Sequence, residues 1–154
     1  MSTTSAGLLL HRLSGGSIEV LLGHMGGPFW ARKDAHAWSV PKGLYTDEEP
    51  IAAAEREFAE ELGSPAPSGP TVPLGSVRQS GGKTVTVFAR EGDFDATSIS
   101  SNEFELEWPR GSGRMQSFPE IDRAGWFGLE EAAEKLVKAQ APFLDRLREH
   151  LAGS

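Results

Sequence analysis

The segment from Gly43 to Ser64, GLYTDEEPIAAAEREFAEELGS, constrains this chain more tightly than any other stretch. Within it, Glu57, Glu60 and Glu61 are spaced three and four residues apart in a region whose pattern predicts a helix. Because an α-helix has about 3.6 residues per turn, the three carboxylates fall within an arc of roughly 100°. Like charges crowded on one helical face are unfavourable unless a cation compensates them. Hard oxygen ligands suit Mg²⁺ or Mn²⁺, so the pattern favours a divalent metal site that also engages substrate phosphates.

Signals at both ends of this segment support a helix over residues 50–62. Pro50 is suited to the first helical turn, and Gly63 is suited to a left-handed C-cap. An acidic helix is more often a solvated surface, but here an apolar stripe runs beside the acidic one, so one face can pack while the next lines a cleft. The stripe consists of Ile51, Ala54, Phe58 and Leu62.

The segment resembles the signature of the Nudix hydrolase family, G-x5-E-x7-R-E-U-x-E-E-x-G-U, in which U is a bulky aliphatic residue. Its C-terminal half matches at these positions: Arg56, Glu57, Phe58, Glu60, Glu61 and Gly63. The final aliphatic position is occupied by Ser64, which weakens packing after the helix but carries no chemistry. The resemblance implies a Nudix α/β/α sandwich, an α/β fold with a central mixed sheet, over residues 6–150.

The first acidic position of the signature can be assigned in two ways. Counting back from Arg56 selects Glu48 and shortens the preceding loop, whereas counting forward from Gly43 selects Glu49 and shortens the helical part. We prefer Glu48, because a deletion is absorbed more easily in a loop than in a helix. The expected partner of Glu48 is Arg56, which would tie the loop to the helix; the alternative is that Arg56 pairs on the surface with Glu60, one helical turn away.

The resemblance also implies roles for single residues. Mg²⁺ or Mn²⁺ is expected to bind Glu57, Glu60, Glu61 and the backbone carbonyl of Gly43, and a carboxylate assists proton removal from water. A glycine at position 43 lets the backbone approach an ion closely. Glu120 is the expected additional acid, since many family members place one in a loop before a Trp-bearing strand. Three glutamates that alternate along a predicted strand compete for that role: Glu103, Glu105 and Glu107.

The residues before the signature predict how a substrate would bind. Lys42 can meet phosphate as a compact cation. The string Trp38–Gly43, WSVPKG, resembles the W-x-x-P-K-G entry of Nudix enzymes that cleave dinucleoside polyphosphates or diphosphoinositol phosphates, so Trp38 is an expected substrate-binding residue. Further aromatic residues can stack on a base, although such residues are more often packed in a core. They are Phe29, Trp30 and Trp108.

Composition excludes several other classes. The chain has 154 residues, which suits a single domain over residues 6–154 after a flexible tail at 1–5. It has no cysteine, which removes disulfides and thiol nucleophiles and is compatible with a cytoplasmic location. A net charge of −7 argues against a nucleic-acid partner. There is no apolar run near the roughly 18 residues of a membrane span and no basic-then-apolar start, so neither a signal peptide nor a membrane partner is expected.

The pattern predicts strands before and after the central helix. They are expected at residues 6–13, 18–24, 38–40, 74–79, 84–90, 103–108 and 125–127. Two further amphipathic helices are expected at 129–137 and 142–151. Residues 41–43 are expected to end a strand, and residues 109–119 to form a loop.

These observations predict a Mg²⁺-dependent pyrophosphohydrolase, a monomer or homodimer, that hydrolyses a phosphoanhydride bond in a small nucleotide or polyphosphate. Dinucleoside polyphosphates or nucleoside triphosphates are the leading substrates, and diphosphoinositol polyphosphates or ADP-ribose-type compounds the alternatives. A non-catalytic nucleotide-sensing domain is a further alternative, although its hallmark would be loss of the acids that this chain keeps. An isoprenoid-isomerase-like activity is disfavoured, because such members of the superfamily use a cysteine.

Overall fold

The computed structural model describes residues 3–153, apart from the side chain of Ser80. Its strands are β1 (Thr3–Ser14), β2 (Ser17–Met25), β3 (Trp38–Ser39), β4 (Lys42–Leu44), β5 (Thr71–Gln79), β6 (Lys83–Glu91), β7 (Glu103–Glu107), β8 (Met115–Pro119) and β9 (Ile121–Gly128). Its α-helices are α1 (Pro50–Leu62), α2 (Leu129–Lys135) and α3 (Pro142–Ala152), with 3₁₀ turns at Ser80–Gly82 and Lys138–Gln140. Across residues 3–153, no helix has the length and apolar content needed to span a membrane.

A mixed sheet forms the centre of the fold. Within residues 3–153, seven strands join in the order β3-β2-β1-β6-β5, with β4 also paired to β1 and β9 to β2. The pairing of β1 with β6 is parallel, and the other pairings in this sheet are antiparallel. The parallel register sets Thr3 opposite Lys83, which brings the start of β6 beside the start of β1, where the end of β4 also pairs.

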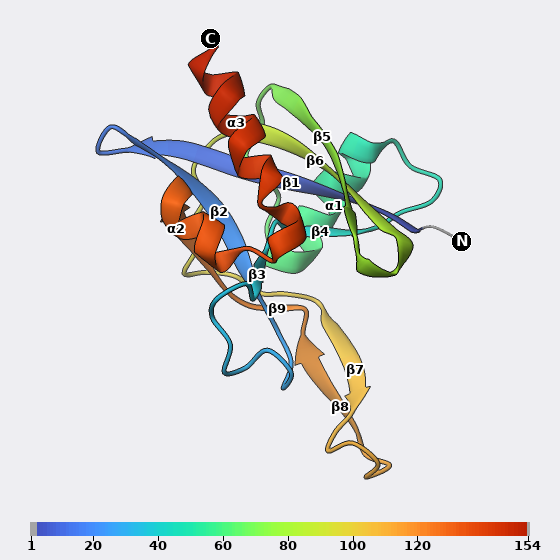
Figure 1. Cartoon of the computed structure of the whole chain (residues 1–154). Helices are drawn as coiled ribbons and strands as arrows, with labels where there is room; N and C mark the ends of the chain where they lie inside the picture. The colour runs from blue at the N-terminus through green and yellow to red at the C-terminus, as the bar shows by residue number, and fades with distance from the viewer. Residues whose placement is uncertain (1–2, 154) are drawn as a thin grey trace.

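Helices cover both faces of this sheet. Leu8 and Leu10 of β1 pack with Phe58 of α1 on one face, whereas Leu9 packs with Phe143 of α3 on the other. Successive side chains of a strand point to opposite faces, so a strand between two helical layers is apolar throughout. Figure 1 shows α2 and α3 on the near face and α1 on the far face. The predicted α/β/α sandwich with a central mixed sheet is confirmed.

Several predicted boundaries were wrong where pairing partners lie far along the chain. Three of the five predicted tail residues, Thr3–Ser5, belong to β1, and the other two lie outside the described residues. Residues 42–44 continue as β4, because they pair with Ser5–Gly7 of β1. The predicted strand at 125–127 extends over residues 121–128 as β9, and the predicted helix at 129–137 ends at residue 135.

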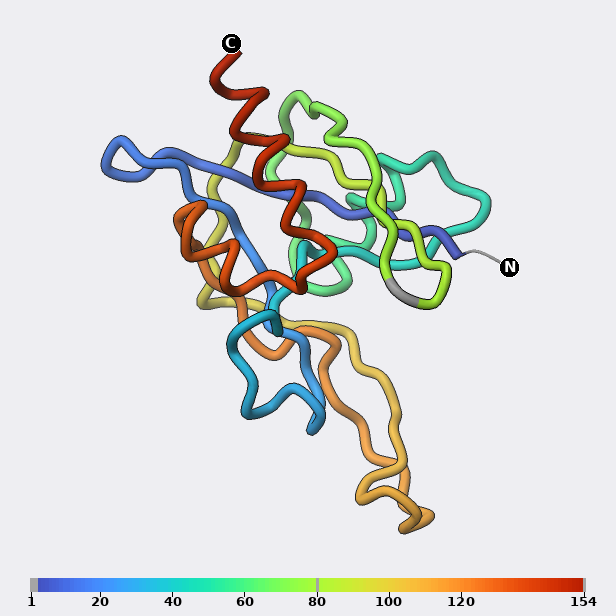
Figure 2. Tube along the Cα trace, in the orientation of Figure 1, coloured from blue at the N-terminus to red at the C-terminus, as the bar shows by residue number. Residues whose placement is uncertain are grey.

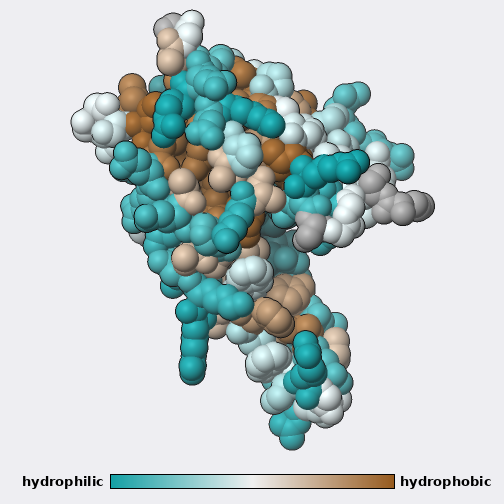
Figure 3. All heavy atoms as spheres, viewed as in Figure 1, coloured by the Kyte–Doolittle hydropathy of each residue, from teal (hydrophilic) through white to brown (hydrophobic). Residues whose placement is uncertain are grey.

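The predicted loop at 109–119 instead contains β8, which pairs with β7 in an arm that projects from the body (Figures 1 and 2). The turn at its tip forms because Gly111 and Gly113 adopt positive φ angles and donate backbone N–H bonds to the carboxylate of Glu107. Hydrophilic residues dominate the tip of the arm in Figure 3. The Phe104 and Phe118 rings lie 6.0 Å apart between the two strands of the arm.

The C-terminal end of α1 depends on a glycine for two reasons. Gly63 has a φ of 81°, and its N–H donates to the carbonyl of Ala59. A Cβ at this position would lie 2.5 Å from the carbonyl oxygen of Ser100, so the following segment crosses the helix end at a distance that only glycine allows.

Replacing Gly63 with alanine should lower the free energy of unfolding by about 1–3 kcal/mol, because the left-handed backbone is strained for other residues and Ser100 blocks relief. The matched control is Gly153→Ala at the C-cap of α3, where φ is −86° and a Cβ meets only an ordinary contact at 3.5 Å. Urea denaturation measures both variants. Equal losses in the two would show that the close approach of Ser100 does not matter.

Candidate active site

A cleft of about 400 Å³ lies where β4, α1 and the starts of β1 and β6 meet. Residues from segments distant in sequence line it, and most of them are charged or polar: Ser5, Lys42, Gly43, Leu44, Glu57, Glu61, Lys83, Asn102 and Glu120. The cleft therefore brings together two carboxylates of α1, the glycine of the signature, the preceding lysine and the expected downstream acid.

Glu57 is held against the backbone of β4. Its residue is only 9% exposed, and a Cβ built on Gly43 would lie 1.9 Å from its Oε2. Oε2 is buried and has no hydrogen-bond partner among the described residues. A buried carboxylate oxygen without a partner is costly, so this atom is available to a ligand that can share its charge.

Glu61 lies one helical turn further along the same face of α1. Its Oε1 accepts a hydrogen bond of 3.2 Å from the backbone N–H of Lys42. The segment preceding Gly43 is therefore fixed to the helix that carries the carboxylates.

The charges in the cleft shift one another's ionisation. Burial, followed by repulsion from Glu60, raises the pKa of Glu57 from 4.5 to about 7. Burial also raises the pKa of Glu61 to about 8, although the N–H and the ammonium of Lys42 oppose the shift. Burial lowers the pKa of Lys42, and the charge of Glu61 partly restores it. Carboxyls that share a buried site in this way are typical of functional sites, since a cation would compensate them.

Arg56 joins the loop before α1 to the helix. Its Nη2 and Nε lie 2.7 and 2.9–3.0 Å from the Glu48 carboxylate, so the predicted pairing is confirmed. Glu49 instead occupies the N-cap position and makes no side-chain capping bond, which supports the choice of Glu48 as the first acid of the signature. The alternative partner is also present, because Arg56 Nη1 lies 3.2 Å from Glu60. Glu60 is exposed at the edge of the cleft rather than in its lining, as far as the structure describes it.

Glu120 enters the cleft from the short link between β8 and β9. The negative charge of Glu120 contributes to the raised pKa values of both Glu57 and Glu61. The competing glutamates, Glu103, Glu105 and Glu107, lie on the exposed face of the arm. The carboxylate of Glu107 accepts hydrogen bonds from backbone N–H groups of the turn at the tip of the arm. Of the four acids, the structure places Glu120 in the cleft.

Trp38 is not placed as expected. It is 5% exposed, packs edge-on against Phe127 and His24, and donates its indole N–H to Asp34. The reason is that β3 pairs with β2, which turns the ring into the core beneath α2. The prediction of Trp38 as a substrate-binding residue is therefore corrected to a core residue.

The remaining aromatic residues lie outside the cleft lining that the structure describes. Phe29 is 58% exposed, whereas Trp30 packs partly against the core; Lys33 lies 5.2 and 5.3 Å from the two ring centroids. Trp108 follows β7 at the tip of the arm, at the end away from Glu120.

Four lining residues were missed by sequence reasoning: Ser5, Leu44, Lys83 and Asn102. Lys83 reaches the cleft only because β6 runs parallel to β1 and starts beside it. A parallel pairing between segments about eighty residues apart leaves no local signal in the sequence. Ser5 was missed because the tail was not expected to enter the sheet.

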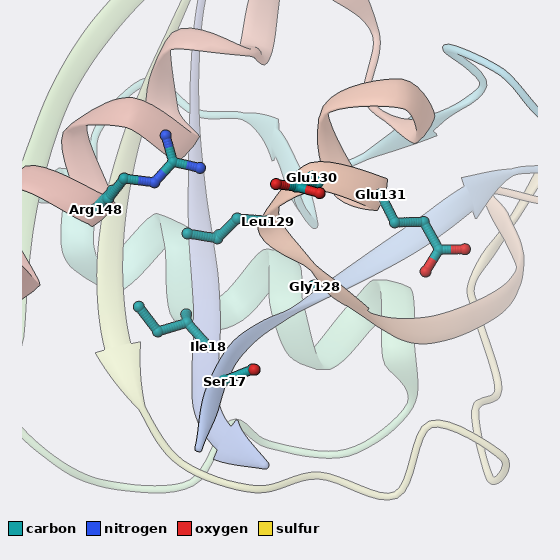
Figure 4. Close-up of a pocket in the computed structure, with 7 residues that line it drawn as sticks. All are labelled: Ser17, Ile18, Gly128, Leu129, Glu130, Glu131 and Arg148. Atoms are coloured by element: carbon teal, nitrogen blue, oxygen red, sulfur yellow. The ribbon is translucent and has the colours of Figure 1, made fainter. Parts of the chain in front are cut away.

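A larger hollow, of about 590 Å³, lies elsewhere between the start of β2, the start of α2 and α3 (Figure 4). Its lining includes Glu130, Glu131 and Arg148, and Arg148 is paired with Asp145 at 3.5 Å. None of the residues expected for the site lines it, so we place the site in the smaller cleft on the grounds of its chemistry.

The cleft fits a hard divalent cation. The unpartnered Oε2 of Glu57, the close approach of Gly43 and the neighbouring Glu61 supply oxygen donors without a blocking side chain. In the described part of the chain, no three His, Asp or Glu side chains converge so as to hold an ion on their own. Mg²⁺ is commonly bound by one or two carboxylates together with waters and substrate phosphates, and Glu57 and Glu61 are the two carboxylates of α1 in the lining.

Removing Glu48 and Arg56 together should cost less stability than the sum of the single alanine variants, because either change alone breaks the same ion pair. We expect the coupling to be small, because both side chains are partly exposed and solvent screens the pair. Thermal unfolding of the four proteins of the cycle measures it. Glu49→Ala paired with Arg56→Ala is the control and should be additive; coupling there instead would favour Glu49 as the first acid.

The metal-free protein should lose stability as the pH rises from about 5 to about 8. The raised pKa values of Glu57 and Glu61 mean that the folded state keeps protons that the unfolded state has released, so raising the pH favours unfolding. Thermal unfolding in EDTA measures this, with Glu61→Gln as the comparison, because that variant should show a shallower dependence. An identical pH dependence in both proteins would contradict the assigned burial of Glu61.

Comparisons with known proteins agree with this fold. A family profile described as NUDIX domain matches residues 1–147. An Ap4A hydrolase from C. elegans superposes with a TM-score of 0.65 at 22% identity, over 99% of this chain and 99% of that chain. The NUDIX domain of Shewanella oneidensis NrtR, complexed with ADP ribose, gives 0.66 at 16% identity, over 98% and 89%. A Nudix hydrolase from M. smegmatis, RenU, gives 0.64 at 26% identity, over 97% and 86%. No curated protein matches the sequence.

The structural likenesses show the fold, and the family profile spans nearly the whole chain, including the Gly43–Ser64 segment from which the resemblance was inferred. The chain therefore belongs to the Nudix family, and this membership supports a hydrolase that acts on pyrophosphate bonds.

Proposed function

We propose that this chain is a Mg²⁺-dependent pyrophosphohydrolase whose preferred substrates are dinucleoside polyphosphates. The observation that carries the proposal is the composition of the cleft, which is lined by Glu57 and Glu61 of α1 together with Lys42 and Lys83. Such a site accommodates a linear chain of phosphates, because the acids require a divalent cation and the lysines offer charge to phosphates beyond it.

The carbonyl of Gly43 and the carboxylates of Glu57 and Glu61 would hold Mg²⁺ or Mn²⁺, and Glu60 would join them from the edge of the cleft. When bound, such an ion would neutralise charge and make a neighbouring water easier to deprotonate. Arg56 and Glu48 keep the loop and helix in register, while Lys42 and Lys83 orient the phosphates. Water attacks one phosphorus, the bond from that phosphorus to the bridging oxygen breaks, and Glu120 accepts the proton from the water. The products are two phosphate compounds.

Two comparisons support different substrates within this reaction class. The likeness to an Ap4A hydrolase favours a dinucleoside polyphosphate, for which Phe29 is our proposed base-stacking residue and Trp30 its neighbour. The likeness to a domain complexed with ADP ribose favours a nucleoside-diphosphate sugar as the second candidate. The positive charge of Lys83 favours the dinucleoside polyphosphate, because a substrate with extra phosphates gains more binding energy from an added cation. We further propose a cytoplasmic monomer or homodimer, in keeping with the cysteine-free sequence.

Hydrolysis of diadenosine tetraphosphate with Mg²⁺ should exceed that of ATP and ADP-ribose in kcat/KM and should stop when EDTA is added. Lys83→Ala should reduce the preference for the tetraphosphate over ATP, whereas Lys138→Ala, which changes an exposed lysine outside the cleft lining that the structure describes, should leave it unchanged. Glu61→Gln should lower kcat about 100-fold or more, since the amide keeps the shape but loses the charge. Chromatography of the products measures all of these rates.

Activity that survives EDTA, or a Glu61→Gln variant within about threefold of the parent, would refute the metal-dependent hydrolase. Faster turnover of ADP-ribose would leave the hydrolase standing and replace the substrate. Tight binding of nucleotides without turnover would instead identify a sensing domain.

A further inference from the structure

The C-terminal end of α1 is closed by a segment that comes from far along the chain. The last carbonyls of a helix have no partner within the helix and need one from elsewhere. Here the carbonyl of Glu60 accepts a 2.9 Å hydrogen bond from the N–H of Asn102, and the carbonyl of Leu62 accepts one of 3.3 Å from Ser100. The helix that carries Glu57 and Glu61 is thus joined directly to the residues that precede β7.

The same segment continues to Glu120. The carbonyl of Asn102 accepts a 2.9 Å bond from the N–H of Glu120, and the carbonyl of Glu120 accepts a 2.9 Å bond from the N–H of Gly26. The backbone of Glu120 is therefore held on both sides, by the segment that closes α1 and by the loop after β2. Figure 2 shows this loop beside the base of the arm.

The hydroxyl of Ser101 holds the backbone beside Glu120 by two hydrogen bonds. It donates a 2.9 Å bond to the carbonyl of Asn102 and accepts a 3.1 Å bond from the N–H of Ile121. Asn102 and Glu120 lie one residue beyond the last pair of the β7–β8 ladder, Glu103 and Pro119, so these hydrogen bonds lie at the base of the arm.

Gly26 allows the loop to reach Glu120. A Cβ at position 26 would lie 1.9 Å from the carbonyl oxygen of Pro119 and 3.4 Å from the carbonyl carbon of Glu120. The obstacle is backbone, which cannot rotate away as a flexible side chain could. Any other residue at position 26 must therefore push the Pro119–Glu120 link and the loop apart.

We propose that Gly26 and Ser101 are positioning residues, which hold the backbone of Glu120 so that its carboxylate stays in the cleft with Glu57 and Glu61. This inference rests on the proposed function in one respect, namely that Glu120 takes part in hydrolysis. The hydrogen-bonded connection itself runs from Glu60 through Asn102 and Glu120 to Gly26 and links the acids of α1 to the loop that carries Phe29. A displacement of Glu120 by an ångström or two would then lower the rate without removing a functional group.

The test combines each positioning variant with the loss of Glu120. Gly26→Ala and Ser101→Ala are measured alone and in a Glu120→Gln background. Gly128→Ala is the matched control, because a Cβ there meets nothing within 4 Å and the φ is −62°. Gly26→Ala should lower kcat about tenfold or more and Ser101→Ala several-fold, with KM changing less than about threefold. In the Glu120→Gln background neither should lower kcat further, because both act through Glu120.

Amide hydrogen exchange followed by NMR gives a readout that does not depend on activity. In the Gly26→Ala protein the amides of Glu120 and Asn102 should exchange faster, while amides of β1 and β6 keep their protection. Should Gly26→Ala fail to fold, Ser101→Ala carries both readouts, since it removes only one hydroxyl.

The results separate the two claims. Kinetic losses that multiply in the double variants, or unchanged kcat in both single variants, would overturn the positioning role. Parental kcat in Glu120→Gln would also overturn it, while leaving the hydrolase intact. A parent protein that hydrolyses no phosphoanhydride would refute the proposed function, and unchanged exchange at Glu120 in Gly26→Ala would refute the connection independently of that.

Discussion

The close approach of the Glu57 carboxylate to Gly43 is the contact on which the rest of the site depends. It buries a charge against backbone, and the Oε2 atom has no hydrogen-bond partner among the described residues. Burial of this kind is unfavourable by itself, and repulsion from the neighbouring Glu60 adds to the cost. The fold tolerates it because α1 is anchored by apolar packing on its other side, through Ala54, Phe58 and Leu62. The unfavourable contact is the feature that makes the cleft receptive to a cation.

The surrounding structure keeps that contact in register from three directions. The N–H of Lys42 fixes β4 to Glu61, and the ion pair between Arg56 and Glu48 fixes the intervening loop. At the C-terminal end of α1, backbone N–H groups of the segment before β7 donate hydrogen bonds to the last carbonyls of the helix. The same segment accepts a hydrogen bond from the N–H of Glu120, so the position of Glu120 is tied to that of α1. Each of these hydrogen bonds and ion pairs joins segments that the strand order of the sheet places side by side. The sheet topology therefore determines where the carboxylates of the cleft lie.

The sequence was most informative where local signals agreed with one another. The predicted bounds of the helix at 50–62 are those of α1, because the proline, the apolar stripe and the left-handed glycine all specify the same ends. The choice of Glu48 over Glu49 rested on a one-residue deletion being absorbed more easily in a loop than in a helix. Tertiary pairing decided the rest. β8 is a strand because β7 lies beside it, Trp38 is a core residue because β3 joins β2, and Lys83 reaches the cleft through a parallel pairing that no nearby residue signals.

A crystal grown with Mn²⁺ and analysed by anomalous diffraction would test the central claim most directly, because it locates the ion without reference to activity. The account predicts anomalous density in the cleft, within about 2.5 Å of a carboxylate oxygen of Glu57 or Glu61, with the carbonyl of Gly43 as a further ligand. Density only at the exposed glutamates of the arm, or none in the cleft at a Mn²⁺ concentration that supports hydrolysis, would contradict it.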